Sequence, residues 1–420
     1  MKVFPDYSEK LGEFGVHDPS VIKDKGKYYT ISTHGFYQFR VSSDLIHWVD
    51  EKKSCFDNKS IKKELNEGIK YCNVEVPISR SEGSPFWAPD IIKIGGKYYM
   101  YYSISSFGST QSYIGLCKSK NLFGEYCQVG CVVKSKGGGR VDLPNAIDPC
   151  VRVDKVGKLW MSYGSFFGGI YIVELDKSSG LTKKKNDIGH HIAGGKMAPV
   201  EGSYIIYNKQ TGYYYLFLSF GGLTDSYNIR VARSKKINGP YLDPNNRLMT
   251  DSDWDNLGGM ILANYHFSHQ KDTYTAPGHN SVLLDNNNFY LIHHTRLNCK
   301  VDKHYLNVRK MYFNRLGWPV VIPNRYYKDK LYLSNKNING MYNIILFKHL
   351  TSNKTNESTQ VKIELNKNLK KSHQYIEFIY DNDVYYGVIA EGFDNYLESK
   401  TLQFSAMNTS GETIVGIKVK

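Results

Sequence analysis

Short apolar segments rich in tyrosine recur along residues 26–295, and each begins just after a polar turn. Five of them share this pattern: "GKYYTIS" (26–32), "GGKYYMYYS" (95–103), "GKLWMSYGS" (157–165), "GYYYLFLS" (212–219) and "NNFYLIHHT" (287–295). Each is short and dense in aromatic residues, which is typical of strands rather than helices. Helical periodicity is nearly absent, so the pattern predicts β-structure throughout.

Each of these segments follows a shorter apolar run that opens on a polar residue. The five runs are "DPSVIK" at Asp18, "APDIIK" at Asp90, "DPCVRV" at Asp148, "EGSYII" at Glu201 and "GHNSVLL" at His279. Further strand-like runs follow every pair, so a unit of several short strands repeats five times. Such a repeat predicts an all-β fold, a five-bladed β-propeller whose blades pack around one axis.

The propeller prediction brings the polar residues of the five runs together. The innermost strand of each blade lies beside the central channel, so residues near its start converge on one point. Asp18, Asp90, Asp148, Glu201 and His279 should therefore face one another. Clustered carboxylates repel one another when ionised, and fold stability gives no reason to gather them. We interpret the point of convergence as a functional site.

A domain boundary is expected near residue 330. The fifth unit ends with "RLGWPVVIPNRYY", and residues 331–420 carry strand-like runs without a further repeat. We predict that residues 1–330 form the five-bladed propeller, which carries the site. Residues 331–420 are enough for a C-terminal β-domain, a small β-barrel or sandwich.

The composition limits the classes of partner. The chain of 420 residues has a formal net charge of +14, but its lysines are scattered through turns and form no basic stripe. We therefore expect no nucleic-acid partner, and we favour a solvated basic surface over attraction to an acidic polysaccharide. Aromatic residues make up 14% of the chain, which suits β-sheets and also surfaces that stack on sugar rings.

The cysteines, the apolar runs and the start of the chain point to no further functional site. The seven cysteines show no metal-ligand spacing. No apolar run is long enough to span a membrane, so we expect no membrane partner. The start "MKVFPDYSEK" lacks an apolar signal region, which indicates either a cytoplasmic protein or removal of a signal.

Seven motifs carry a resemblance to a known family. In chain order they are "VHDPSV", "FWAPDII", "NAIDP", "GSFFGGIYIVELD", "VEGSYI", "YNIRVARS" and "PGHNSV". The set resembles glycoside hydrolase family 43 and, within it, the two-domain endo-α-1,5-L-arabinanases. The resemblance implies a secreted glycosidase that cleaves internal linkages of arabinan or arabino-oligosaccharides with inversion, and a metal ion, commonly calcium, in the channel. We expect it to act as a monomer.

The resemblance also assigns roles by motif. It makes Asp18 in "HDPS" the general base, Glu201 in "VEGSY" the general acid, Asp148 in "NAIDP" the carboxylate that orients and tunes the acid, and His279 in "GHNS" the metal ligand. The base must stay ionised and the acid must keep its proton near neutral pH, which the charge of Asp148 would favour. Blades one and four are not neighbours, which predicts the carboxyl separation of about 6.5–9.5 Å found in inverting enzymes.

Other residues resemble positions that line the sugar subsites of the family. These candidates, each with an alternative role in packing or turns, are Trp87, Phe107, Asn145, Ser165 and Phe166. We interpret Asp90 as a structural or substrate hydrogen-bonding group rather than a further catalytic acid. His293 and His294 are adjacent in a strand and should point to opposite faces, so they are not expected to share one metal ion.

Two other functions remain open at this point. The first is an exo-acting α-L-arabinofuranosidase or β-xylosidase on the same scaffold, because these enzymes share the acid triad and differ in the shape of the cleft. The second is a non-catalytic carbohydrate-binding propeller, which would keep the aromatic residues but would have no use for Asp18, Asp148 and Glu201 together.

Overall fold

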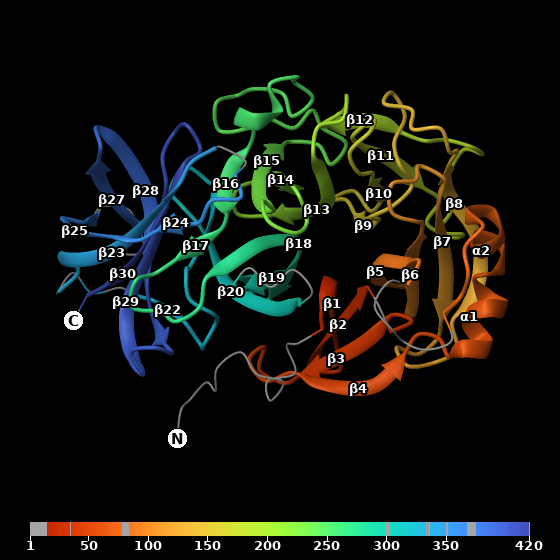
Figure 1. Cartoon of the computed structure of the whole chain (residues 1–420), viewed down its shortest axis with the longest axis horizontal. Helices are drawn as coiled ribbons and strands as arrows, with labels where there is room; N and C mark the ends of the chain where they lie inside the picture. The colour runs from red at the N-terminus through yellow and green to blue at the C-terminus, as the bar shows by residue number, and fades with distance from the viewer. Residues whose placement is uncertain are drawn as a thin grey trace.

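The computed structural model describes residues 15–33, 35–77, 84–298, 303–332, 334, 337–349, 352–367 and 375–419. Antiparallel sheets follow one another along the chain and stand around a common axis, and a further sheet lies on one side of them (Figure 1).

The first four sheets are four-stranded, and their strands follow chain order. Blade 1 consists of β1 (His17–Asp24), β2 (Lys27–Thr33), β3 (Gln38–Ser42) and β4 (Val49–Ser54). Blade 2 consists of β5 (Phe86–Ile94), β6 (Lys97–Ile104), β7 (Ser112–Ser119) and β8 (Cys127–Ser135). Blade 3 consists of β9 (Cys150–Val153), β10 (Leu159–Tyr163), β11 (Ile170–Leu175) and β12 (His190–Ala193). Blade 4 consists of β13 (Val200–Asn208), β14 (Tyr213–Phe220), β15 (Asn228–Ser234) and β16 (Gly259–Leu262).

Blade 5 is larger than the other blades. Its main strands are β18 (Tyr274–Asp285), β19 (Asn288–Leu297), β20 (Tyr305–Phe313) and β21 (Pro319–Val321). Two short strands, β17 (Tyr265–His266) and β24 (Asn356–Glu357), extend the sheet beyond β18.

The first strands of the blades form a closed ring. β1 packs against β5 and β18, β9 packs against β5 and β13, and β13 packs against β18. Each of these contacts joins neighbouring blades, and the contact between β1 and β18 closes the circle. The predicted all-β fold with a five-bladed propeller is confirmed.

The hydrophobic core lies between adjacent blades, which explains the tyrosine doublets of the sequence. In β6, Tyr98 packs toward blade 1, whereas Tyr99 packs toward blade 3. In β14, Tyr214 packs toward blade 3 and Tyr215 toward blade 5. Successive side chains of a strand point to opposite faces. Because both faces of these strands are buried, the strands need no polar side.

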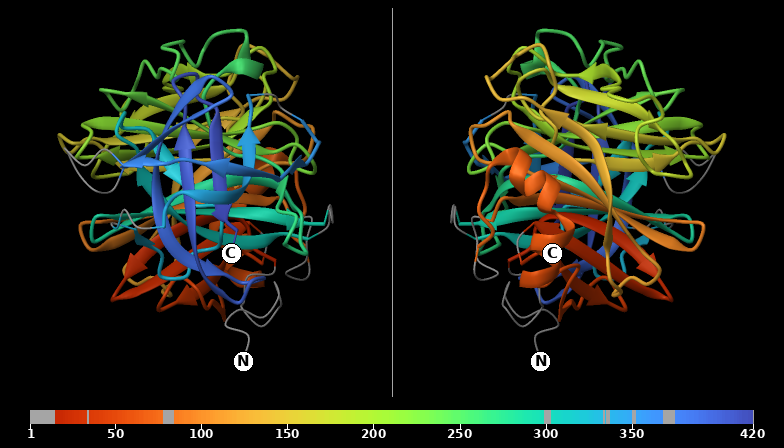
Figure 2. Two further views of the ribbon diagram at one scale, coloured as in Figure 1. Left: turned by 90° about the vertical axis from the view of Figure 1, so that its left-hand side faces the viewer. Right: turned by 90° about the vertical axis from the view of Figure 1, so that its right-hand side faces the viewer.

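Two short helices lie between blades 1 and 2, where the sequence predicted no helix. They are α1 (Asn58–Glu64) and α2 (Asn66–Cys72), and Figure 2 shows them at the outer edge of blade 2. α2 packs on β7, and a Cβ added to Gly68 would lie 2.8 Å from the side chains of Ile104 and Tyr113. Each helix has only 7 residues, about two turns, so its apolar spacing gives no periodic signal.

The C-terminal domain is built on one antiparallel sheet (blue in Figure 1). In spatial order its strands are β25 (Thr359–Ile363), β23 (Gly340–Phe347), β30 (Thr413–Lys418), β29 (Ser399–Met407), β28 (Asp383–Asp394), β27 (Tyr375–Tyr380) and β26 (Asn366–Lys367). A further strand, β22 (Lys330–Leu331), pairs with β28.

Packing and backbone pairing both join this domain to the propeller. One hydrophobic cluster runs from Met260 and Val320 of blades 4 and 5 into Phe347 and Val415 of the C-terminal sheet. β24 pairs with β17 and so carries a piece of the C-terminal region into blade 5. Across the described ranges, no helix is long and apolar enough to cross a bilayer.

Candidate active site

Four of the predicted side chains meet on the ring of inner strands. Asp18 lies in β1, Asp148 just before β9, Glu201 in β13 and His279 in β18. Nδ1 of His279 lies 3.2 Å from Oδ1 of Asp18. The backbone N–H of Gly202, next to Glu201, donates to Oδ2 of Asp148 over 3.1 Å. Residues from four different blades are thus brought together as the propeller prediction required.

Three of these four residues have a left-handed backbone. φ is +51° at Asp18, +59° at Asp148 and +44° at His279. A residue before proline normally favours an extended backbone, and both aspartates precede proline, so the fold imposes their conformation. The pairing register also shifts at Asp18, at Glu201 and around His279. Such bulges re-aim side chains and are frequent beside active sites.

Asp18 is a buried carboxylate surrounded by donors. Thr33 Oγ1 donates to its Oδ2 over 2.7 Å, and Nε2 of His17 lies 3.2 Å from its Oδ1, on the same oxygen as His279. Burial acts to raise the pKa of Asp18, but His17 and His279 outweigh it and hold the pKa well below its ordinary value. The group is therefore ionised at neutral pH, as a general base must be.

Two hydroxyl groups hold the carboxyl group of Glu201. Ser165 Oγ donates to Oε2 over 2.6 Å, and the Tyr227 hydroxyl donates to Oε1. Hydroxyl groups both donate and accept, so these partners can accommodate the carboxyl group with or without its proton. A half-buried acid with both oxygens oriented in this way is suited to proton transfer.

Asp148 lies beside the predicted acid and is buried. Burial raises the pKa of Asp148 well above its ordinary value, and the charges of Glu201 and Asp18 add to that rise, whereas His279 opposes it. This carboxyl group therefore holds a proton more readily than an ordinary aspartic acid. The sequence had assigned Asp148 the part of a charged neighbour, but the structure also makes it a group that can share a proton with its surroundings.

The predicted sugar-contacting residues lie in different environments. Phe107 is 96% exposed, which leaves its ring open to solution. Trp87 is half-buried, and its indole N–H donates to the Ser84 carbonyl over 3.0 Å. The exposed ring of Phe107 and the partly exposed ring of Trp87 are both available for contact with a sugar, and this role stays a prediction.

The other three predicted substrate contacts are tied into the protein. Asn145 is buried, and its Oδ1 accepts from Ser135 over 3.3 Å. Ser165 is also buried and orients Glu201. Phe166 has φ of +45°, and its N–H donates to the Val200 carbonyl, so it fixes the loop beside the acid.

Asp90 has a structural role, which is one of the two that the sequence left open. Its Oδ2 lies 2.8 Å from Arg152 and accepts from the Val151 N–H, and its Oδ1 accepts from Ser20 Oγ. These contacts tie blade 2 to blades 1 and 3. With all of these partners inside the protein, the carboxylate is a bridge between blades rather than a further acid or base.

Two buried residues that contact the predicted acid and base were not predicted. Tyr227 donates to Glu201, and its ring stacks on His294 with centroids 5.9 Å apart. His294 in turn accepts the backbone N–H of Asp18. Tyr227 opens the run "YNIRVARS", one of the seven motifs of the family resemblance, in which we had assigned no site residue. The alternation of His293 and His294 was a usable signal, but only the closed ring shows that the second histidine meets Asp18.

The donors around His279 do not form a cage for calcium. Calcium takes six to eight oxygen ligands, whereas this histidine offers one imidazole, and its Nδ1 already faces Asp18. The carboxylate of Asp18 is the group that must stay available as a base. A calcium ion at His279 would need water for most of its ligands, and the acid and base roles of Glu201 and Asp18 do not require it.

In a second histidine cluster, two of the three rings are committed to hydrogen bonds. His17, His294 and His304 are buried with ring nitrogens within 4.8 Å of one another. The N–H of Asp18 donates to Nδ1 of His294, and Arg296 donates to Nε2 of His304. In each neutral ring the other nitrogen then carries the proton and has no lone pair for a metal.

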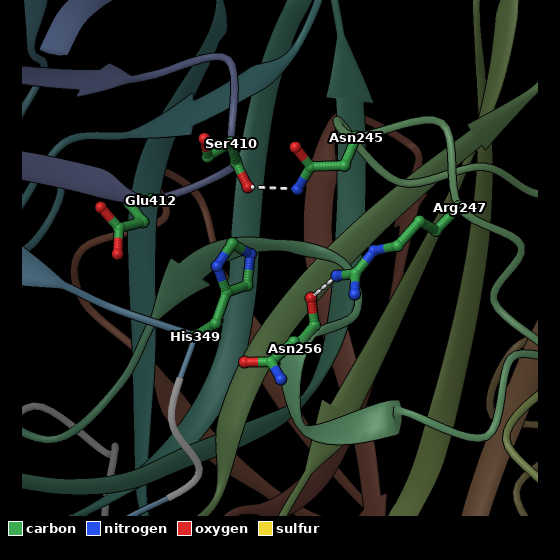
Figure 3. A pocket seen from close by; sticks show the side chains of 6 residues that line it. All are labelled: Asn245, Arg247, Asn256, His349, Ser410 and Glu412. Carbon is green, nitrogen blue, oxygen red and sulfur yellow. Dashed lines mark hydrogen bonds between the residues drawn. The ribbon is translucent and has the colours of Figure 1, made fainter.

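A cavity of about 500 Å³ lies at the seam between blade 4 and the C-terminal domain, and neither Asp18 nor Glu201 lines it (Figure 3). Its lining residues are Asn245, Arg247, Asn256, His349, Ser410 and Glu412. Asn245 donates to the Ser410 carbonyl and Arg247 to the Asn256 carbonyl, so much of its polar surface is paired within the seam. We interpret this cavity as part of the domain interface.

Known proteins share both parts of the chain. A family model described as "Glycosyl hydrolases family 43" matches residues 12–319, and one described as "C-terminal lipocalin-like domain" matches residues 323–416. An extracellular endo-α-(1→5)-L-arabinanase of Thermotoga petrophila is 35% identical over 96% of this chain and 94% of its own length. The crystal structure of an endo-1,5-α-L-arabinanase from the same organism has a TM-score of 0.88 at 33% identity, over 97% of this chain and 99% of that one.

A relative with a different named activity matches less of the chain. An extracellular exo-α-(1→5)-L-arabinofuranosidase of Cellvibrio japonicus is 29% identical, and the match covers 73% of this chain and 86% of that protein. The family model alone spans well over half of the sequence, and the acid and base candidates lie within it. The chain belongs to glycosyl hydrolase family 43.

Proposed function

We propose that this family 43 chain is an inverting endo-α-1,5-L-arabinanase that cleaves internal linkages of arabinan and of arabino-oligosaccharides. The contrast between two carboxyl groups carries the proposal. Asp18 is kept ionised by two histidines, whereas Glu201 is held by two hydroxyl groups. The two groups stand on blades 1 and 4, which are not neighbours in the ring of five. This arrangement supports an acid and a base that work from opposite sides of one bond.

In the proposed reaction, Asp18 takes a proton from a water molecule that attacks the anomeric carbon. Glu201 gives its proton to the glycosidic oxygen as that bond breaks. The new bond to water oxygen forms on the face opposite the leaving group, so the configuration inverts. Asp148 contacts the backbone next to Glu201 and orients the acid for this transfer.

Endo action is favoured over the two alternatives. The endo-acting relative matches nearly the whole chain, including the C-terminal domain, whereas the exo-acting relative matches 73% of it. A non-catalytic binding propeller would have no use for an ionised base beside an oriented acid.

The proposal also covers where the protein acts, its oligomeric state and its metal ion. The protein acts outside the cell, because the relatives named above are described as extracellular. It acts as a monomer on a polymer substrate. A calcium ion near His279, held mostly through water, is proposed on the family resemblance alone.

Product analysis on linear, debranched arabinan tests the proposed function. We expect a ladder of arabino-oligosaccharides early in the reaction, and faster release of reducing sugar from arabinan than from xylan. Arabinose as the sole product would instead indicate an exo-acting enzyme. If neither polymer releases reducing sugar, the chain is a non-catalytic carbohydrate-binding propeller.

A further inference from the structure

We propose that His294 and Tyr227 are positioning residues that hold the general base and the general acid in register with each other. The inference rests on the proposed function, because it concerns the arrangement of Asp18 and Glu201. His294 is 0% exposed and Tyr227 is 1% exposed, so both lie behind the carboxyl groups rather than against a substrate. They act through Asp18 and Glu201 and are not themselves catalytic.

His294 supports the strained backbone of the base. Asp18 has φ of +51° at the register shift between His17 and Ser20, and its N–H therefore has no regular partner strand. That N–H donates to Nδ1 of His294 over 3.2 Å. The side chain of a residue in blade 5 thus satisfies the backbone group that the bulge in blade 1 frees, and fixes the direction of the Asp18 side chain.

This hydrogen bond also sets the state of the imidazole. A backbone N–H can only donate, so Nδ1 of His294 must present a lone pair and the ring must be neutral with its proton on Nε2. Burial lowers the pKa of His294 to about 3, in keeping with a neutral ring. The 3.5 Å approach of Nδ1 to Oδ1 of Asp18 is therefore not an ion pair. As a neutral ring, His294 brings no positive charge to the base, and its hydrogen bond acts on the backbone of Asp18.

Tyr227 connects His294 to the acid. Its ring stacks on His294 with an interplanar angle of 17°, and its hydroxyl donates to Oε1 of Glu201. Gly278 pairs with His294 across β18 and β19, and a Cβ on Gly278 would overlap the Tyr227 ring. The Tyr227 ring, which precedes β15 of blade 4, therefore packs directly against β18 of blade 5. Through it, the backbone of the base and the side chain of the acid share one rigid support.

Three substitutions at position 294 test the role through kcat. The amide oxygen of His294→Asn can accept the Asp18 N–H in place of Nδ1, whereas the amide of His294→Gln lies where Nε2 was. We expect His294→Ala to lower kcat on linear arabinan by about 10²-fold with little change in KM, because a displacement of about 1 Å can cost that much. His294→Asn should recover most of the loss, and His294→Gln should not.

The pH profile separates positioning from electrostatics. Because the His294 ring is neutral, His294→Ala removes no positive charge beside Asp18, so the acidic limb of kcat/KM should move less than it does in His279→Gln. Tyr227→Phe keeps the ring and removes only the hydroxyl, so it folds in the same packing. It should lower kcat by about tenfold, the size expected for one hydrogen bond to an ionisable group.

His293→Ala is the matched control. His293 lies on the same strand, is equally buried and points to the opposite face. It should lower the melting temperature without changing kcat per folded molecule. The inference is overturned if His294→Ala and His294→Asn have equal kcat. It is also overturned if His294→Ala and Tyr227→Phe both keep the wild-type kcat. In either case the proposed function still stands. A wild-type protein inactive on linear arabinan would overturn the proposed function and this inference together.

Discussion

Nδ1 of His279 lies 3.2 Å from Oδ1 of Asp18, and this contact joins blade 5 to blade 1 where the ring closes. Burial acts to raise the pKa of the carboxyl group, but His17 and His279 outweigh burial and lower it. His17 is the neighbour of the base in β1, whereas His279 meets it only because the propeller closes. The pH dependence of the enzyme should report this contact directly.

His279→Gln should move the acidic limb of the kcat/KM profile to higher pH. The base works only when ionised, and loss of a positive neighbour raises the pKa of Asp18, so activity is lost at a higher pH as the solution is acidified. The profile of the wild type after chelation is the control. If the acidic limb lies at the same pH in His279→Gln and in the wild type, the His279 imidazole does not lower the pKa of Asp18.

Asp18→Asn and Glu201→Gln should each lower turnover of arabinan by about 10²-fold or more, because general acid and general base catalysis each contribute at least that much. Fold and oligosaccharide binding should persist, since each change keeps the volume of the side chain. An aryl arabinofuranoside with a very acidic leaving group should partly rescue Glu201→Gln but not Asp18→Asn. Equal rescue of both variants would contradict the assigned roles.

Asp148→Asn should raise the melting temperature, and the gain should grow as pH rises above about 4, the ordinary pKa of aspartate. The folded-state pKa of Asp148 is raised by burial, so its contribution to stability is present below the unfolded pKa and is lost as pH rises through the folded one. The asparagine has no such loss. Thermal unfolding of both proteins at several pH values measures the difference, and a gain independent of pH would contradict a raised pKa.

Much of the fold was predictable because both faces of the second strands, such as β6 and β14, are buried. The doublet of Tyr98 and Tyr99 reflects contacts with two different blades, and five such units require a ring. The meeting of Asp18, Asp148, Glu201 and His279 follows from that ring. The helices α1 and α2 gave no signal because each is about two turns long.

The parts of the site that escaped prediction depend on contacts between distant blades. Tyr227 and His294 come from different blades, and nothing local in either run shows that one ring stacks on the other. The left-handed backbone of Asp18 and Asp148 runs against the preference of a residue before proline, so local rules give no sign of it. The raised pKa of Asp148 likewise depends on its burial in the assembled ring.

Removal of metal tests the proposed calcium. If an ion near His279 supports the site, exhaustive chelation should lower activity or the melting temperature, because a ligand that binds only the folded state stabilises it. Added calcium should restore the loss. His279→Ala should reproduce the loss and become insensitive to the chelator. A protein equally active and stable after chelation would leave His279 with its contact to Asp18 alone.

The stereochemistry of the first product shows whether Asp18 and Glu201 act as base and acid across the ring. An inverting enzyme needs room for a water between the two groups, about 6.5–9.5 Å, whereas a retaining enzyme holds them about 5–5.5 Å apart. Proton NMR of a fresh hydrolysate of α-linked arabinan, recorded before mutarotation, distinguishes the two outcomes. We predict that the β-anomer appears first. An initial α-anomer would contradict both inversion and the assignment of Asp18 as the base.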